Sequence, residues 1–447
     1  MTLKNNFYPL MKLILPLAMT GITQSGVWFF NTLFLAHLGP NALAVGSLVS
    51  WLFGTVIVIL FGTLSSINIL IAHKHGAEDD QSILEIVRDG FWLAILFAVP
   101  TFLLFWNMSP LFLLFGQTPT IVLLAQNYLR AMAWGVLPNL IMLALLEVIM
   151  GLGRARLILV FSLFSVALTV FFSFALIFGK FGLPALGIDG AGWGLTVSNW
   201  IIVLFLGGYV FTNQRYKRYF GLLFTPTKTS HFVELLHVGI PVGIMYCVEV
   251  AFFFALTLIM GSFDSLIMAA NQIALQYLGS LMAVIFSTAQ AITVRMGHLL
   301  GAGDKASAKS TAYLGIYIST IFMLVVALFY WFFPSQLISI DFDVSKPENA
   351  EIVNFATQFL MVCAIFQIFE AMRVSLFAFL RALKDTRFTL LISILSFWGI
   401  ALPFGYFLAI YFNLGGTGLW WGMVLGAAVS VLLLLWRFKL KIARYSL

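Results

Sequence analysis

Four ionisable side chains lie inside long apolar stretches of this sequence. A charge in such a stretch is energetically costly, so each one needs either a stabilising partner or a functional role. The four residues are Glu147, Glu249, Glu370 and Arg373. Glu249 lies near the middle of the apolar run 232–262, and its neighbours Val248 and Val250 offer it no partner. A carboxylate in such surroundings must exchange a proton, coordinate a cation or keep a permanent hydrogen bond to a carbonyl or hydroxyl group. The first two alternatives are functional, and the third is structural.

Glu370 and Arg373 are three residues apart, so on a helix they share one face. Two interpretations stay open: a structural ion pair that makes both charges tolerable, or an ion-binding Glu370 whose properties Arg373 tunes. A further alternative is that the long side chain of Arg373 reaches water, away from Glu370. Glu147 lies one turn before Gly151, where water or Arg154 could reach it, so a structural role is favoured.

The composition indicates which elements must hold these groups. The chain has 447 residues, of which 62% are hydrophobic and 9% charged, and its mean hydropathy is +1.03. Soluble domains carry about 25% charged residues, so an ordinary soluble enzyme and a nucleic-acid-binding protein are excluded. Apolar stretches long enough to span a bilayer recur throughout and predict an all-α, polytopic membrane protein with twelve transmembrane helices. The predicted spans are 8–38, 43–72, 89–108, 121–151, 157–179, 190–212, 232–262, 267–299, 310–333, 352–382, 388–411 and 417–438.

The basic residues predict the orientation of these spans. Twenty of the 24 Lys and Arg residues fall in alternate loops or in the two tails. Cytoplasmic loops of membrane proteins carry such an excess of basic residues. We therefore expect an integral, multi-pass membrane protein with both termini in the cytoplasm.

An internal repeat predicts how the spans are grouped. A shift of 225 residues pairs Pro16 with Pro241, Thr63 with Thr288, His73 with His298, and Asp79 with Asp304. The spans then form two homologous six-helix lobes related by a pseudo-two-fold axis along the membrane normal. The predicted lobes are residues 1–212 and 231–447, joined by a cytoplasmic linker at 213–230. Two equal lobes around a central cleft favour a transporter over a receptor or a scaffold.

The motifs that the sequence lacks limit its chemistry. It has no nucleotide-binding loop of the G-x-x-x-x-G-K type, no nucleophile–base motif and no metal-ligand cluster. It therefore predicts neither an enzyme nor a cofactor, and it leaves an ion gradient as the energy source. A membrane enzyme would need a polar catalytic cluster, and a channel is usually symmetric around a pore built from several subunits.

Four short segments carry a family resemblance. They are Val294 to His298 followed by Gly301-Ala302-Gly303, Leu380 to Thr386, Pro241 with Glu249, and Trp398 with Pro403, Gly405 and Tyr406. With these segments in this order and at this spacing, the chain resembles the multidrug and toxic compound extrusion (MATE) family, closest to its NorM-like branch. The resemblance covers nearly the whole chain.

The resemblance implies a twelve-helix, two-lobed secondary active antiporter of a bacterial inner membrane. Such proteins export cationic, amphipathic drugs and toxic compounds in exchange for H⁺ or Na⁺. We expect small cationic molecules and the lipid bilayer as partners, no nucleic acid, and a monomer. The alternative is a flippase for a lipid-linked precursor, which would need cationic side chains to hold a phosphate head group.

The resemblance also assigns roles to single residues. Glu249 and Glu370 match the membrane acids of the seventh and tenth spans and are the expected coupling pair for H⁺ or, alternatively, Na⁺. Phe366 matches a tyrosine one turn before the second acid, and Gln276 matches an asparagine of the eighth span, so both would shape the pocket. We further expect Arg373 to act as a built-in cation that crowds out sodium and leaves protons to Glu249.

In the N-terminal lobe the matching positions carry no titratable group. Asn31 stands where many family members have an aspartate, and Gln24 is the repeat partner of Glu249. Both are expected to line the pocket, with the coupling carboxylates confined to the C-terminal lobe.

Overall fold

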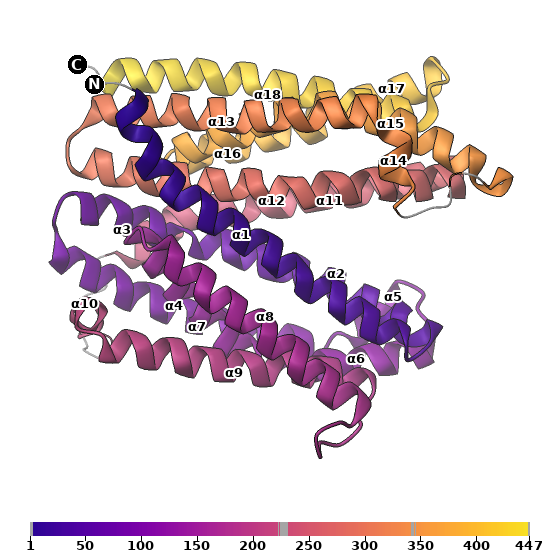
Figure 1. Cartoon of the computed structure of the whole chain (residues 1–447), viewed down its shortest axis with the longest axis horizontal. Helices are drawn as coiled ribbons and strands as arrows, with labels where there is room; N and C mark the ends of the chain where they lie inside the picture. The colour runs from indigo at the N-terminus through magenta and orange to yellow at the C-terminus, as the bar shows by residue number, and fades with distance from the viewer. Residues whose placement is uncertain (1–2, 222, 224–230, 341–343, 345, 446–447) are drawn as a thin grey trace. The chain divides into compact units, whose positions relative to one another are not determined.

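Helices make up nearly all of the structure. The computed structural model (Figure 1) describes residues 3–221, 223, 231–340, 344 and 346–445, and no strand occurs among them. Eleven described helical segments are long and apolar enough to cross a membrane, and a bent pair gives a twelfth when it is counted as one span. The prediction of an all-α, polytopic membrane protein is thereby confirmed. Of the predicted linker, residues 222 and 224–230 lie outside the described part.

Close packing divides the chain into two units. One is Leu15–Gly243, and the other combines Met1–Ile14 with Ile244–Leu447. The division cuts two long helices within their lengths, α1 (Leu3–Ala36) and α11 (Phe232–Phe263). The predicted lobes 1–212 and 231–447 stay a prediction, because they were defined by the sequence repeat and not by packing.

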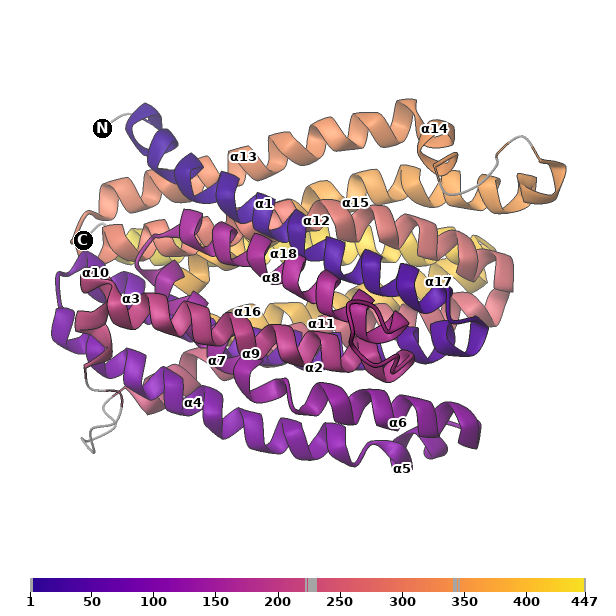
Figure 2. The same ribbon diagram turned by 60° about the horizontal axis from the view of Figure 1, so that its bottom comes forward.

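In the unit Leu15–Gly243, short turns join a series of apolar helices. They are α2 (Pro40–Leu64), α3 (Ser66–Gly76), α4 (Asp80–Trp106), α5 (Ser109–Leu114), α6 (Pro119–Ala133), α7 (Val136–Gly151), α8 (Ala155–Phe178), α9 (Ile188–Thr212), α10 (Gln214–Lys217) and the 3₁₀ turn η1 (Arg218–Phe220). Helix α8 packs along α9, and α4 packs against α6 and α7 (Figure 2).

A bend interrupts one span of this unit. The sequence predicted a single helix over 121–151, whereas α6 and α7 meet at an angle of 49°. Pro138 explains the break, since it has no N–H to bond to the carbonyl group of Trp134 four residues earlier. That carbonyl group instead accepts a hydrogen bond from the indole N–H of Trp200 at 3.1 Å. The bend therefore leaves the Trp134 carbonyl with a partner.

The other unit is built around the long helix α15 (Ala350–Ala382). Its elements after α11 are α12 (Ser265–Gly301), α13 (Lys305–Phe332), α14 (Pro334–Ile338), η2 (Pro347–Asn349), α15, α16 (Thr386–Ser393), η3 (Ile394–Ala401), α17 (Leu402–Tyr411) and α18 (Gly415–Tyr445). Helix α15 packs against α12, α13 and α18, and Figure 1 shows α13 and α18 running alongside it. From Glu370 to Ala382, every residue of α15 except Met372 is buried. Polar side chains on this stretch therefore face protein, which makes charges tolerable there.

The span that follows α15 changes its helical type part-way. Helix α16 continues into η3, a π-helix, and then into α17. Pro403, in the first turn of α17, cannot donate an N–H to the carbonyl group four residues earlier, so regular α-helical bonding cannot run through this point. π-Helical segments occur frequently at functional sites. This one directly follows Ser393 and contains Phe397, and both residues contact the charged groups of the unit.

Candidate functional site

Arg373 lies at the centre of a buried cluster of charges. Its Nε donates to Oε2 of Glu370 at 2.8 Å, and its Nη2 donates to Oε1 of the same carboxylate. Its Nη1 donates to Oε1 of Glu249 at 2.8 Å and to Oγ of Ser393 at 3.4 Å. Ser393 in turn donates to Oε1 of Glu249 at 3.0 Å. We call these four residues the acid–arginine cluster.

Three helices of one unit supply the acid–arginine cluster. Glu370 and Arg373 lie on one face of α15 because they are about one turn apart. Glu249 comes from α11, and Ser393 is the last residue of α16. All four residues are buried, and the side chain of Arg373 is only 1% exposed. The alternative in which Arg373 reaches water, away from Glu370, is therefore wrong.

Aromatic rings enclose the guanidinium group. The ring centroids of Phe377 and Phe397 each lie 4.7 Å from Cζ of Arg373. Phe252 of α11 packs on Phe397, with the ring centroids 4.8 Å apart. Aromatic faces attract cations, and the dry surroundings strengthen every charge–charge contact in the cluster. The cation is thus held by two carboxylates and two rings.

The formal charges of the cluster do not balance. Two carboxylates and one guanidinium group leave a net charge of −1 when all are ionised. Arg373 engages both oxygens of Glu370, whereas Oε2 of Glu249 has no hydrogen-bond partner among the described residues. An uncompensated buried charge is costly. This oxygen is therefore the atom at which the cluster can take up a proton or a monovalent cation.

Phe366 and Gln276 lie outside the hydrogen bonds of the cluster. Phe366 is fully buried and meets Trp420 edge to face, with centroids 6.2 Å apart, and Trp420 donates to Oδ1 of Asn271 at 3.1 Å. Gln276 is exposed, and its backbone carbonyl accepts from the hydroxyl group of Ser280. The buried amide of α12 is thus Asn271, and the pocket roles of Phe366 and Gln276 stay predictions.

Asn31 and Gln24 belong to the other unit, Leu15–Gly243. Asn31 donates to the hydroxyl group of Tyr128 at 3.0 Å, and Gln24 donates to the hydroxyl group of Ser162 at 2.9 Å. Both are neutral hydrogen bonds to protein, and neither involves a carboxylate. Their places in a substrate pocket stay predictions.

Glu147 is also buried in the unit Leu15–Gly243. Its exposed fraction is 3%, and the side-chain amide of Asn68 donates to its Oε2. Of the two alternatives that the sequence left open, water or Arg154, the burial of α7 at this point argues against water. The Asn68 bond supports the structural role that the sequence favoured.

The sequence did not predict three residues that contact the acid–arginine cluster or belong to it: Phe377, Ser393 and Phe397. They are uncharged and lie in segments no more polar than their neighbours. The one available signal is Pro403, which marks a break in the span and hence a place where side chains leave the regular helical spacing.

Comparison with known proteins decides the family. The model of the MatE family matches residues 16–175 and 241–407. The two matched segments begin 225 residues apart, which is the shift of the internal repeat. The chain belongs to the MATE family. This MATE chain is 32% identical to the "Multidrug resistance protein NorM" of Burkholderia vietnamiensis, over 96% of its own length and 93% of that protein.

Further relatives of the MATE chain agree in sequence and in fold. It is 32% identical to a "Probable multidrug resistance protein NorM" of Pseudomonas putida, over 97% of this chain and 94% of that one. It superposes on a MOP superfamily transporter from Pyrococcus furiosus with a TM-score of 0.89, at 18% identity over 98% of this chain and 96% of that one. An outward-facing multidrug resistance MATE family transporter gives a TM-score of 0.88 at 18% identity over the same shares. At these identities the two structures show the fold alone, whereas the family makes this chain a transporter rather than an enzyme.

Proposed function

We propose that this MATE chain is a secondary active antiporter that exports cationic, amphipathic compounds in exchange for protons. The observation that carries the proposal is the acid–arginine cluster, whose formal charge is −1 and in which Oε2 of Glu249 lacks a partner among the residues described. One proton or one monovalent cation can balance that charge, but not both together. This competition is the chemical basis of exchange, because the two occupants stabilise different states of the site.

Protonation of Glu249 changes how α11 is held. The carboxylate ties α11 to α15 through Arg373 and to α16 through Ser393. A protonated carboxyl group no longer attracts the guanidinium group as an opposite charge. Its bond from the hydroxyl group of Ser393 becomes a neutral one, with roughly half the strength of a charge-assisted bond. Helix α11 is then freer to shift against α15 and α16. Release of the proton restores the ionic bridge.

Arg373 favours protons over sodium as the coupling ion. Its nitrogen atoms lie 2.8 Å from oxygens of both carboxylates, so a sodium ion between them would meet a fixed positive charge. Like charges at such distances repel strongly in a poorly polar interior. A proton bonded to Oε2 of Glu249 neutralises the cluster without that repulsion. Glu370 stays ionised as the permanent partner of Arg373, and sodium bound at Glu249 and Glu370 is the alternative.

We propose that the chain works as a monomer in a bacterial inner membrane, with both termini in the cytoplasm. The orientation rests on the 20 Lys and Arg residues in alternate loops and tails. The location is supported by bacterial relatives that carry the name NorM. Its partners are then the bilayer and small cationic molecules.

Dye transport in liposomes tests the proposal. The purified chain is reconstituted in neutral lipid, and a fluorescent cationic dye is followed under a pH gradient and, separately, under a sodium gradient. We expect the pH gradient to drive the dye against its concentration gradient and the sodium gradient to have no effect. Transport that requires sodium and ignores pH contradicts proton coupling. If neither gradient moves the dye, antiport is wrong and the flippase alternative gains support.

A further inference from the structure

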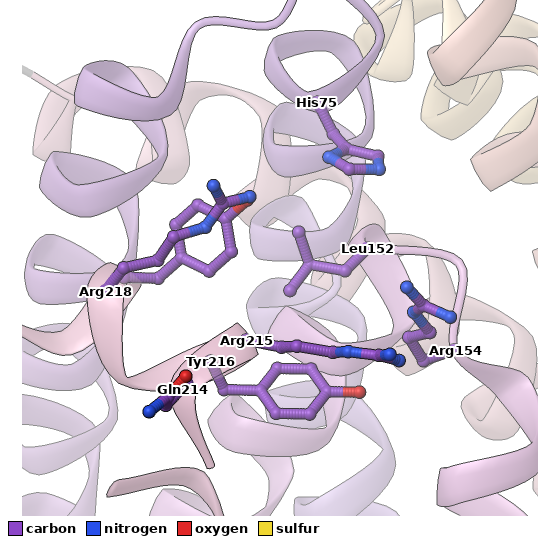
Figure 3. Close-up of a pocket in the computed structure, with 8 residues that line it drawn as sticks. His75, Leu152, Arg154, Gln214, Arg215, Tyr216 and Arg218 are labelled. Carbon is purple, nitrogen blue, oxygen red and sulfur yellow. The ribbon is translucent and has the colours of Figure 1, made fainter.

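A basic pocket opens in the unit Leu15–Gly243, and none of the membrane acids is among its lining residues. Its volume is about 330 Å³, and its lining includes Arg154, Arg215, Arg218, His75 and Tyr216. These residues come from the ends of α3 and α10, from the turn before α8 and from η1. Figure 3 shows Arg154 and Arg215 together on one side of the pocket, with Arg218 across from them.

The positive charge of this basic pocket is only partly compensated. Arg218 pairs with Asp80 at 3.1 Å, and its guanidinium group lies over the ring of Tyr219. Arg154 and Arg215 are exposed, and in the described part of the chain neither has an ion-pair partner. Two guanidinium groups that line one pocket without a carboxylate leave a local charge of about +2, which attracts an anion.

A turn of similar geometry in the other unit offers a comparison for Arg154. The turn between α7 and α8 is built like the turn between α15 and α16, since each has a residue of positive φ just before the cap of the next helix. These residues are Gly153, with φ 74°, and Lys384, with φ 58°. The caps that follow them are Arg154 and Asp385. A position that carries a carboxylate in one unit thus carries a guanidinium group in the other.

The two caps have opposite effects on their basic neighbours. Asp385 accepts from Nε of Arg437 at 2.9 Å and lies 3.3 Å from Nζ of Lys441, so it offsets part of their positive charge. Arg154 instead adds a positive charge beside Arg215. In the unit Leu15–Gly243, a bound anion can supply the negative charge that Asp385 supplies in the other unit.

We propose that the basic pocket binds a phosphate-type anion. A guanidinium group presents a planar fork of N–H donors that matches the oxygens of a phosphate group. Two such forks and the hydroxyl group of Tyr216 surround a volume sufficient for a phosphate and part of the group that carries it. The same chemistry is offered by the head group of an anionic phospholipid and by a free phosphate compound.

Binding measurements on purified protein in neutral detergent test this site. The probes are short-chain phosphatidylglycerol, short-chain phosphatidylcholine and inorganic pyrophosphate. The pocket variant carries Arg154→Gln and Arg215→Gln, and the control variant carries Arg156→Gln and Lys217→Gln. The control removes two exposed basic charges from the same segments without touching the pocket lining.

We expect the pocket variant to raise the Kd of the anionic probe about tenfold or more, because charge-assisted hydrogen bonds are lost. The control variant should keep the Kd of the wild type. Binding of phosphatidylglycerol but not of pyrophosphate identifies a lipid head group as the ligand, and binding of pyrophosphate identifies a free phosphate compound. Equal losses in both variants, equal binding of phosphatidylcholine, or no binding at all would overturn the proposal.

A conservative variant guards against failure to fold. Arg154→Lys with Arg215→Lys keeps both charges and removes the planar forks. If the anion is recognised by the forks, this variant should bind more weakly than the wild type and more tightly than the Gln variant. Unchanged binding in the Lys variant would overturn recognition by guanidinium groups.

Discussion

At the residue scale, Arg373 decides what the two membrane acids can do. Half of this arrangement follows from the sequence, since a spacing of three residues puts Glu370 and Arg373 on one helical face. The other half could not be predicted. Glu249 is 124 positions away from Arg373 and reaches it only because α11 packs beside α15. The contribution of Ser393 depends on the same tertiary packing.

Replacing Arg373 should reveal how strongly the carboxylates depend on it. Arg373→Met strands two buried carboxylates, and we expect a loss of about 3–5 kcal/mol in the free energy of unfolding. Thermal unfolding in detergent measures this loss. The exposed Arg156→Met is the control, and equal melting temperatures for the two variants would contradict the account.

At the scale of the element, two turns of the repeat are capped alike. Asp79 accepts from the backbone N–H of Ser82 at 3.1 Å before α4, and Asp304 accepts from that of Ser307 at 2.9 Å before α13. Hydrogen bonds from these serines lower the pKa of both carboxyls, and the pKa of Asp79, which Lys74 also contacts, falls to about 2. An aspartate ahead of an apolar run is a helix-start signal that sequence alone provides.

The cap of α4 predicts a dependence of stability on pH. Because the pKa of Asp79 is lowered from 3.8 to about 2 in the folded chain, its contribution is complete above about pH 4 and is lost as the pH falls toward 2. Asp79→Asn keeps a side-chain acceptor for the cap but removes its charge. Asp79→Ala removes the acceptor as well and should lower the free energy of unfolding by about 1 kcal/mol. Melting temperatures across this pH range test both expectations. If the wild type still melts at a higher temperature than Asp79→Asn by the same margin at about pH 2, the cap does not act through its charge.

The same two turns differ in backbone strain. Glu78 has φ 56°, and its repeat counterpart Gly303 has φ 77°, a region that favours glycine. We expect Glu78→Gly to raise the free energy of unfolding by about 0.5–1 kcal/mol and Gly303→Ala to lower it by about 1 kcal/mol. A methyl group at residue 303 would meet no atom within 4 Å, so only the backbone is tested. The melting temperature should rise in Glu78→Gly and fall in Gly303→Ala. A higher melting temperature for Gly303→Ala than for the wild type would contradict the prediction.

Sequence periodicity did not predict the interruptions within elements. The sequence predicts one uninterrupted span over 121–151 and another over 388–411, yet the first bends between α6 and α7 and the second passes through the π-helix η3. Pro138 and Pro403 mark both places. A proline shows that regular bonding must change, but the bend and the π-helix depend on neighbours such as Trp200, which donates to the freed carbonyl group.

At the scale of the whole molecule, the fold class follows from composition alone. Long apolar runs force helices in a bilayer, because each backbone N–H and C=O group must find its partner within the segment. The repeat reappears in the two segments matched by the family model. Packing divides the chain inside α1, between Ile14 and Leu15, and inside α11, between Gly243 and Ile244.

The two halves of the repeat carry different charges. The acid–arginine cluster belongs to one unit, while Gln24 and Asn31 in the other make neutral hydrogen bonds to Ser162 and Tyr128. This difference supports the proposal that coupling by a titratable group takes place in the unit that contains Glu249.

Dye efflux driven by a pH gradient in liposomes that hold Glu249→Gln tests the central claim most directly. Glutamine preserves the shape of the side chain and an acceptor for Arg373 but cannot exchange a proton. The matched control is Glu351→Gln, which alters an exposed glutamate at the start of α15. We predict that proton-driven efflux falls to background in Glu249→Gln and is unchanged in Glu351→Gln. Thermal unfolding should show that both variants are folded. Efflux by Glu249→Gln at the wild-type rate would contradict the assignment of Glu249 as the proton carrier.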